Sequence, residues 1–421
     1  MFAEWIIFLT WIFANGMIKA YQFPKPDFES PWLHLQAQAE TSKATKTVLH
    51  GLNEVPLFVD VQVKSLDYPN KDYIFQAIGG IPRDDDAAEP FGGVTYIYDN
   101  TQVTVSAPQY SNDGYNSYAI YTENGDFYTG VNNQKRYNVE VRIRAWKKSS
   151  LPPADFERTG IRMKAGQTSN VSDVYVDVQH GLNEYPAFTV VRMNLTDRKG
   201  KLTTMSDAVG ANFVVYRDGK NSQNCHIVHG VSKDRIRVWI DSQNWAYIYA
   251  GIDGYSVDFM SNEGYLEMYA WKSLTMNEQE YSQTSLGPNI PSETLEVPYR
   301  NIVQNPLTRA WARSNTGPNA GFLFQGSGAM AFGRTVTDSV CSYGGLVYAY
   351  NFVNMRFWRP TNATNGGLIC VSNFFGKGTN SQRSVNAEII MRSWGVKSER
   401  KVTKWSVEMP KDNCIRSKPK N

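Results

Sequence analysis

The sequence predicts an all-β protein built from three antiparallel β-sandwich domains in tandem. Apolar residues alternate with polar ones along many short segments, and turn-forming clusters separate these segments. A unit of about 110–120 residues also recurs along the chain, which is the signature of a repeat architecture. Many short alternating strands within a unit of that size are typical of a β-sandwich.

The alternation is clearest in the first unit. Segments 59–63 (VDVQV), 103–107 (VTVSA) and 139–143 (VEVRI) each have an apolar side chain at every second position. Successive side chains of a strand point to opposite faces, so each segment predicts a strand with one face in a core and the other in water. Turn clusters at 111–114 (SNDG) and 124–126 (NGD) separate later strands of this unit.

Internal matches set the domain boundaries. Val48–Pro56 (VLHGLNEVP) and Val178–Pro186 (VQHGLNEYP) share seven of nine residues at an offset of 130. The third unit lacks this box but follows the first elsewhere, as where FLFQ at 322–325 matches YIFQ at 73–76. We therefore expect repeat 1 at 31–150, repeat 2 at 159–275 and repeat 3 at 290–398.

The N-terminal end of the chain indicates a secreted protein, and the C-terminal end is basic. Trp5–Ala14 is apolar except for Thr10, which matches a signal-peptide core and is too short to span a bilayer, so we expect a signal peptide at 1–20. No later apolar run approaches bilayer length, so no membrane span is expected. Residues 399–421 form a basic tail with seven basic and three acidic residues.

A secreted chain can carry glycans and disulfides. Three Asn-x-Ser/Thr sequons make this a candidate glycoprotein, at Asn170, Asn194 and Asn362. Four cysteines allow three connectivities. The strand positions and the size of the loop favour Cys341–Cys370 within repeat 3, which leaves Cys225 and Cys414 to tie the tail to repeat 2.

Charge and motifs narrow the function. The 43 basic and 40 acidic residues give a formal charge of +3, too balanced for a dedicated nucleic-acid binder. The chain has no G-x-S-x-G, P-loop or H-E-x-x-H motif, and the repeats fill nearly the whole mature chain, so we expect no enzyme. A pair of carboxylates brought together by the fold, as in a glycosidase, remains the alternative.

Each of the first two units opens and closes in a recognisable way. Repeat 1 opens with HGLNEVPLFVDVQV (His50–Val63) and closes with VEVRIRAW (Val139–Trp146), and repeat 2 has His180–Met193 and Leu266–Trp271 in the same places. This order resembles the H-type lectin family. The resemblance implies a six-stranded sandwich that trimerises and binds galactose-type sugars. These units are longer and close on Ala-Trp, and the GGVTYIY-type insertion resembles repeats of invertebrate secreted proteins.

Aromatic residues supply the candidate ligand contacts. By strand alternation Trp146 shares the polar face with Arg142 and Arg144, where an exposed ring could stack on a sugar. Packing against a neighbouring unit is the alternative. Aromatic residues on loops of a rigid sandwich suit glycan recognition, unless they belong to the core. The candidates are Trp146, Trp271 and Trp394 at the closing strands and Tyr115, Tyr118, Tyr121, Trp245 and Tyr247 in loops.

One acidic loop is a candidate metal site. Asp84, Asp85 and Asp86 are consecutive, and carboxylate oxygens suit Ca²⁺, which is plentiful outside cells. Acidic loops are commonly only solvated, and the other repeats lack this triplet.

The expected function is that of a secreted, non-enzymatic lectin-like protein that binds glycans or glycoproteins through three modules. Tandem modules raise the apparent affinity for a multivalent surface without new contacts. The alternative is a structural protein of an extracellular matrix, mucus or capsule, whose sandwich repeats self-assemble.

Overall fold

A computed structural model gives the structure of the chain. It describes residues 23–395 except for 82–90, 110–116, 123–127, 198–199, 201–202, 214–216, 219–220, 223–224, 244–245, 252–254, 274–278, 287–295, 299–305, 329–339 and 362–364. The predicted signal peptide and the basic tail lie outside these residues.

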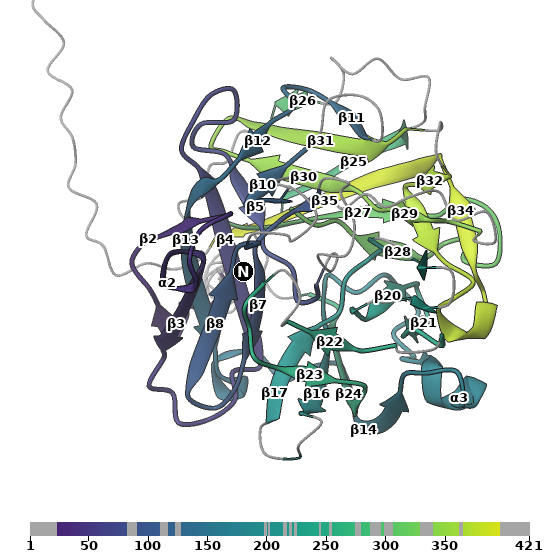
Figure 1. The fold of residues 1–421 in the computed structure, drawn as a ribbon. Coiled ribbons are helices and arrows are strands. Elements are labelled where there is room, and N and C mark those ends of the chain that lie inside the picture. Colours follow the sequence, from purple (N-terminus) through teal and green to yellow (C-terminus); the bar gives the residue numbers. More distant parts are fainter. Residues whose placement is uncertain are drawn as a thin grey trace, which may run out of the picture.

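The chain is nearly all β, and three large sheets contain most of its strands (Figure 1). The strands of these sheets pair in antiparallel fashion throughout, which confirms the predicted fold class at this level. The described α-helices, α2 (Thr41–Ala44) and α3 (Val171–Val174), have one turn each.

The first large sheet joins repeat 2 to repeat 1. Its order is β14 (Phe156–Lys164), β24 (Glu263–Trp271), β16 (Phe188–Thr196), β17 (Thr203–Asp207), β7 (Thr95–Tyr98), β8 (Gln102–Ser106) and β3 (Thr45–Leu49).

The second large sheet joins repeat 3 to repeat 2. Its order is β25 (Gln279–Leu286), β35 (Ala387–Gly395), β27 (Pro306–Arg313), β28 (Leu323–Gln325), β20 (Val228–Val231), β21 (Arg235–Trp239) and β15 (Tyr175–Gln179). Strand β25 lies in the segment between the predicted bounds of repeat 2 and repeat 3.

The third large sheet joins repeat 1 to repeat 3 and closes a ring. Its order is β1 (Phe28–Glu29), β13 (Asn138–Trp146), β4 (Phe58–Ser65), β5 (Ile74–Gln76), β30 (Val347–Tyr350), β31 (Asn354–Pro360) and β11 (Tyr128–Gly130), with β2 (Leu33–Gln36) on β13 and β26 (Glu296–Pro298) on β31.

Short two-stranded sheets complete the fold. They are β6 (Phe91–Gly92) with β9 (Ser117–Tyr118), β10 (Ile120–Tyr121) with β12 (Lys135–Arg136), β18 (Arg217–Asp218) with β19 (Asn221–Ser222), β22 (Tyr249–Ala250) with β23 (Met260–Ser261), β29 (Tyr343–Gly344) with β32 (Gly366–Gly367), and β33 (Ile369–Val371) with β34 (Gln382–Ser384).

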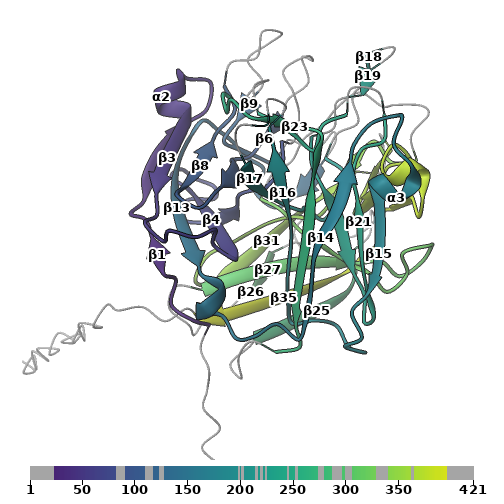
Figure 2. The same cartoon turned by 90° about the horizontal axis from the view of Figure 1, so that it is seen from below.

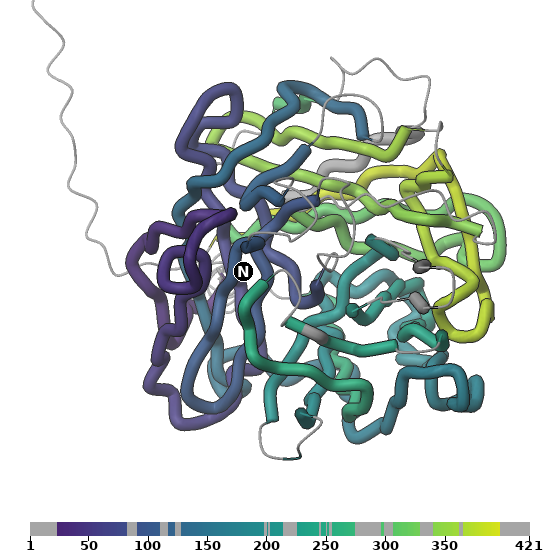
Figure 3. Tube along the Cα trace, in the orientation of Figure 1, coloured from purple at the N-terminus to yellow at the C-terminus, as the bar shows by residue number. Residues whose placement is uncertain are grey.

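Every large sheet therefore crosses from one repeat to the next. Repeat 1 meets repeat 2 where Tyr98 pairs with Met205, repeat 2 meets repeat 3 where Val231 pairs with Leu323, and repeat 3 returns to repeat 1 at Tyr350 and Ile74. Figures 2 and 3 show the purple, teal and yellow-green parts of the chain around one common centre. The repeats are consequently interlocked through shared sheets and are not separate modules.

Three glycines permit the close approach of the repeats. A Cβ on Gly79 would lie 2.3 Å from the backbone oxygen of Asp207, and one on Gly210 would lie 2.0 Å from that of Gln325. Gly328 closes the cycle, because its Cβ would lie 2.3 Å from the backbone oxygen of Gln76. Backbone meets backbone at these points, so no larger residue fits without separating two repeats.

Candidate functional site

The predicted tryptophan sites lie inside the ring. Trp146, Trp271 and Trp394 are each at most 1% exposed. They gather around Phe58 and Phe188, whose ring centroids are 5.0 Å apart, with Trp146 stacked 5.1 Å from Phe58 and Trp394 at 5.6 Å from Phe188. Their burial agrees with the alternative of packing against a neighbouring unit, because that face of each sheet packs against the other repeats, and it leaves these rings unavailable for stacking on a sugar.

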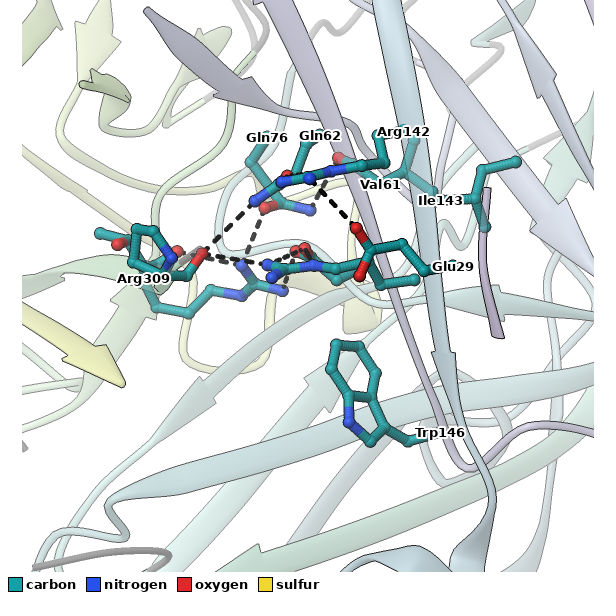
Figure 4. Close-up of polar contacts among 12 residues, drawn as sticks. Glu29, Val61, Gln62, Gln76, Arg142, Ile143, Trp146 and Arg309 are labelled. Atoms are coloured by element: carbon teal, nitrogen blue, oxygen red, sulfur yellow. Dashed lines mark hydrogen bonds and ion pairs between the residues drawn. The ribbon is translucent and has the colours of Figure 1, made fainter. Parts of the chain in front are cut away.

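The polar residues on the same face form a buried ionic network. Asp60 accepts hydrogen bonds from Arg144 of its own repeat at 2.6 and 3.0 Å and from Arg309 of repeat 3 at 2.9 Å. Arg309 also donates to Gln76 Oε1 at 2.8 Å. Figure 4 shows Gln76 and Arg309 of this network, with Gln62, Arg142 and Trp146 nearby. The network joins the first and third repeats and leaves no ligand-accessible surface there.

Electrostatics in this network holds Asp60 ionised. Burial alone would raise the pKa of Asp60, but attraction to Arg144 and Arg309 and the hydrogen bonds from both bring it below its usual value. Asp207, also buried, differs because burial raises its pKa despite hydrogen bonds from the Tyr96 and Tyr98 hydroxyls at 2.7 and 2.8 Å.

A small cavity of about 40 Å³ lies beside this network. It is lined at equivalent positions of the three repeats by Gln76, Asp207 and Gln325. That volume can hold one or a few waters but not a sugar ring.

The three places where one repeat meets the next are equivalent by register. We name them junction 1–2 (β7 with β17), junction 2–3 (β20 with β28) and junction 3–1 (β30 with β5). At each junction, the first-named repeat contributes three neighbouring strands to the shared sheet. The central one of these strands has an outward-facing residue at the same register position: Thr104 on β8, Arg237 on β21 and Arg356 on β31.

An arginine seals junction 2–3. The Arg237 guanidinium lies 4.3 Å from the centre of the Phe322 ring, and its Nε is 3.2 Å from the carboxylate of Asp177 on the adjacent strand. Its Nη1 donates to the carbonyl of Pro318 at 2.7 Å and to Asn319 Oδ1 at 2.8 Å. We call this set of contacts an arginine clamp.

Junction 3–1 repeats the same clamp with other residues. The Arg356 guanidinium lies 4.1 Å from the centre of the Tyr73 ring, and its Nε is 3.2 Å from Glu296. Its Nη1 donates to the carbonyl of Pro69 and to Asn70 Oδ1, both at 2.8 Å. Each clamp thus uses a cation on an aromatic ring, an acid on the edge strand and a Pro-Asn turn of the next repeat.

Junction 1–2 has threonines at all three clamp positions. Thr104 replaces the arginine, Thr47 replaces the acid that faces it, and Thr204 replaces the aromatic residue. The hydroxyls of Thr47 and Thr104 are 3.1 Å apart. The junction is left open, because three small side chains replace a stacked guanidinium, an aromatic ring and an acid.

A second substitution distinguishes junction 1–2 from the other two. Trp239 and Trp358 follow the clamp arginines by two residues, and both are buried against a neighbouring repeat, where Trp239 Nε1 donates to the carbonyl of Thr379 at 2.8 Å. Ser106 occupies this place in repeat 1, and its hydroxyl hydrogen-bonds to the carbonyl of Tyr255 of repeat 2.

The result is a pocket of about 360 Å³ between repeats 1 and 2. Strands β3, β8 and β7 form its floor, β17 one side, and residues 256–259 of repeat 2 the opposite wall. Its described lining contains no lysine, arginine or histidine. The lining residues are Thr41, Thr45, Thr47, Ile97, Tyr98, Asp99, Gln102, Thr104, Thr203, Thr204, Ser256, Val257, Asp258 and Phe259.

Hydrogen bonds fix part of this lining. Thr204 donates to the carbonyl of Tyr98 at 2.9 Å, which ties the side of the pocket to its floor. Asp99 Oδ1 accepts from the backbone of Thr101 at 2.7 Å and of Gln102 at 2.9 Å, so the turn at the rim is fixed by its own aspartate. Asp258 is exposed on the opposite wall.

Two of the predicted loop tyrosines, Tyr118 and Tyr121, belong to a packed interior. Tyr118 is 8% exposed and Tyr121 is fully buried, and their rings stack with centroids 5.3 Å apart. Burial also raises the pKa of Tyr118 to about 12. These two residues therefore do not form the exposed platform that the loop composition indicates, while Tyr247 is half-buried. Tyr115 and Trp245 lie outside the described residues.

The disulfide prediction is confirmed for one pair. Cys341 and Cys370 are bonded, with Cα atoms 5.6 Å apart. Cys225 is buried, and its predicted partner Cys414 lies outside the described residues. Of the sequons, Asn170 is exposed and Asn194 half-buried in β16. Asn362 and the candidate calcium ligands Asp84, Asp85 and Asp86 also lie outside the described residues.

No protein-family model matches the chain, and no curated protein matches it. Within the described part of the chain, helices are too short to cross a bilayer.

Proposed function

We propose that this chain is a secreted, non-enzymatic glycan-binding protein whose three β-sandwich repeats form a single-chain ring. The pocket at junction 1–2 holds the sugar. The observation that carries this proposal is the pocket lining, which combines six threonines and a serine with two carboxylates and an amide.

This lining suits a polyhydroxylated ligand. A sugar hydroxyl both donates and accepts hydrogen bonds, and threonine hydroxyls do the same, whereas carboxylates such as Asp99 and Asp258 accept only. Phe259, Val257 and Ile97 add an apolar part that suits the C–H face of a sugar ring. A volume of about 360 Å³ is within the range of small-molecule sites.

The ring architecture favours recognition over catalysis. The pocket floor belongs to a sheet that runs through two repeats, and the opposite wall is held to that floor by the bond between Ser106 and Tyr255. Such a rigid frame orders the polar groups before the ligand arrives, which lowers the entropy lost on binding. The cyclic closure through shared sheets also agrees with the trimeric arrangement that the lectin resemblance implies.

A binding panel tests the proposal directly. The full chain, produced by secretion and labelled, is applied to immobilised neutral, sialylated and sulfated glycans. We expect selective binding that free monosaccharide competes away. If no glycan is bound and the purified chain instead polymerises as its concentration rises, the proposal fails in favour of the matrix-protein alternative.

A further inference from the structure

We infer that only one of the three junctions binds a sugar, so that each chain takes one ligand, and that this ligand is uncharged. The inference rests on the proposed function and adds valency and ligand class to it. It departs from the expectation of three binding modules, which the sequence repeats indicate.

The valency follows from comparison of the three equivalent junctions. At junctions 2–3 and 3–1 the place of the Thr104 side chain is taken by a guanidinium that is in contact with an aromatic ring. The side chains of Arg237 and Arg356 are only 13% and 11% exposed. A ligand could enter there only if an arginine gave up two hydrogen bonds of 2.7–2.8 Å together with its ion pair.

The clamps also show why the open junction tolerates the loss of its arginine. Thr47 at junction 1–2 replaces Asp177 and Glu296, so no carboxylate is left facing the vacated position. Thr204 replaces a ring that would otherwise be uncovered, and its hydroxyl is satisfied by the Tyr98 carbonyl. The replacements at junction 1–2 therefore leave no unpaired acid at the position of Thr47 and no uncovered ring at the position of Thr204.

The ligand class follows from the charges. Asp99 stands at one rim of the pocket and Asp258 on the opposite wall, and the described lining offers no cation to pair with an anion. A carboxylate or sulfate on the ligand would be desolvated near two like charges, which disfavours it. A neutral hexose or N-acetylhexosamine has no such cost and can donate its hydroxyls to both aspartates.

Rebuilding the clamp tests the location and the number of sites. The triple variant Thr47→Asp, Thr104→Arg, Thr204→Phe copies the clamp side chains of junction 2–3 into junction 1–2. We expect it to weaken binding of the best neutral glycan by about tenfold or more while the unfolding temperature is kept. Asn138→Arg, on an exposed position of β13, is the control for the effect of an added arginine away from the pocket and should leave affinity unchanged.

The converse variant removes a clamp. Arg237→Thr with Phe322→Thr alters junction 2–3 and should leave the affinity of the existing site within about twofold. Isothermal titration of the wild-type chain with the same glycan should give one site. Three equal sites, or loss of binding in the converse variant, would overturn the inference.

Sialylated and sulfated forms of the bound glycan complete the test. We expect them to bind at least about tenfold more weakly than the neutral form, and Asp258→Asn to reduce this discrimination. Equal binding of neutral and acidic forms would refute the ligand class, and full binding by the triple variant would refute the site. Both results presuppose that the wild type binds a glycan, whereas no binding at all refutes the proposed function.

Discussion

Replacement of Asp60 by asparagine should lower the stability of the folded chain more than removal of an exposed ion pair does. Asp60 is fully buried between Arg144, also fully buried, and Arg309, and it accepts three hydrogen bonds from them. Asp60→Asn keeps the shape of the side chain and removes its charge. Two guanidinium groups then remain in the interior without their carboxylate.

The magnitude follows from the cost of an unpaired buried charge. Removing one partner of a buried pair destabilises by about 3–5 kcal/mol, because the remaining charge loses its compensation. For a chain of this length the unfolding entropy is about 0.9 kcal/mol per kelvin, so the unfolding temperature should fall by about 3–6 °C. The exposed pair Lys148–Glu157 supplies the control, since Glu157→Gln should cost less than about 1 kcal/mol.

Calorimetry and denaturant unfolding of both variants measure the difference. The folded state lowers the pKa of Asp60, so its contribution is present above the pKa of the unfolded carboxyl and is lost as the pH falls through the lowered value. The difference in the free energy of unfolding between wild type and Asp60→Asn should therefore be largest at pH 7 and become smaller in strong acid. An Asp60→Asn chain as stable as the Glu157→Gln control would refute the role given to the network.

Two further predictions concern the ring and its histidines. Gly210→Ala should destabilise the folded chain by about 3 kcal/mol or more, because the new Cβ would overlap the backbone of Gln325. Gly230→Ala, whose Cβ would lie 3.0 Å from a ring edge, should cost less in the same unfolding assay. Equal costs for the two variants would contradict the close approach of the backbones. Burial lowers the pKa of His226 to about 3 and of His229 to about 4, so between pH 7 and 4.5 the unfolded chain takes up protons that the folded chain does not. The free energy of unfolding should then fall by roughly 2–3 kcal/mol for each histidine, and His226→Phe should remove the share of this fall that His226 causes; an unchanged pH profile in this variant would count against the assignment.

The sequence was sufficient to predict the strands but not which surfaces they bury. Alternation correctly places Val59, Val61 and Val63 in a core. It also assigns Asp60 and Arg144 to a face in water, and there it fails, because a polar face is buried here against a second and a third repeat. Alternation shows only that the two faces of a strand differ in polarity. It carries no information on whether a segment about 250 residues away in the sequence packs against the polar face.

The sequence does not predict the pocket, for a related reason. The pocket forms because repeats 1 and 2 have threonines where the other two junctions have the clamp arginine, the acid and the aromatic ring. No sequence motif marks a side chain that is smaller than its counterparts. The signal was nevertheless present in the repeat alignment: extending the match of YIFQ with FLFQ upstream aligns Pro69-Asn70 with Pro318-Asn319, the turns of the two clamps. A search for positions where two repeats agree and one differs would have indicated Thr104 and Thr204.

The most direct measurement is a crystal structure of the full chain with the neutral glycan selected by the binding panel. We expect one sugar per chain, bound between Thr104 and Thr204 on one side and residues 256–259 on the other, with Asp99 or Asp258 accepting hydrogen bonds from its hydroxyls. A sugar bound elsewhere on the chain, or at junctions 2–3 and 3–1 with their arginines displaced, would contradict it.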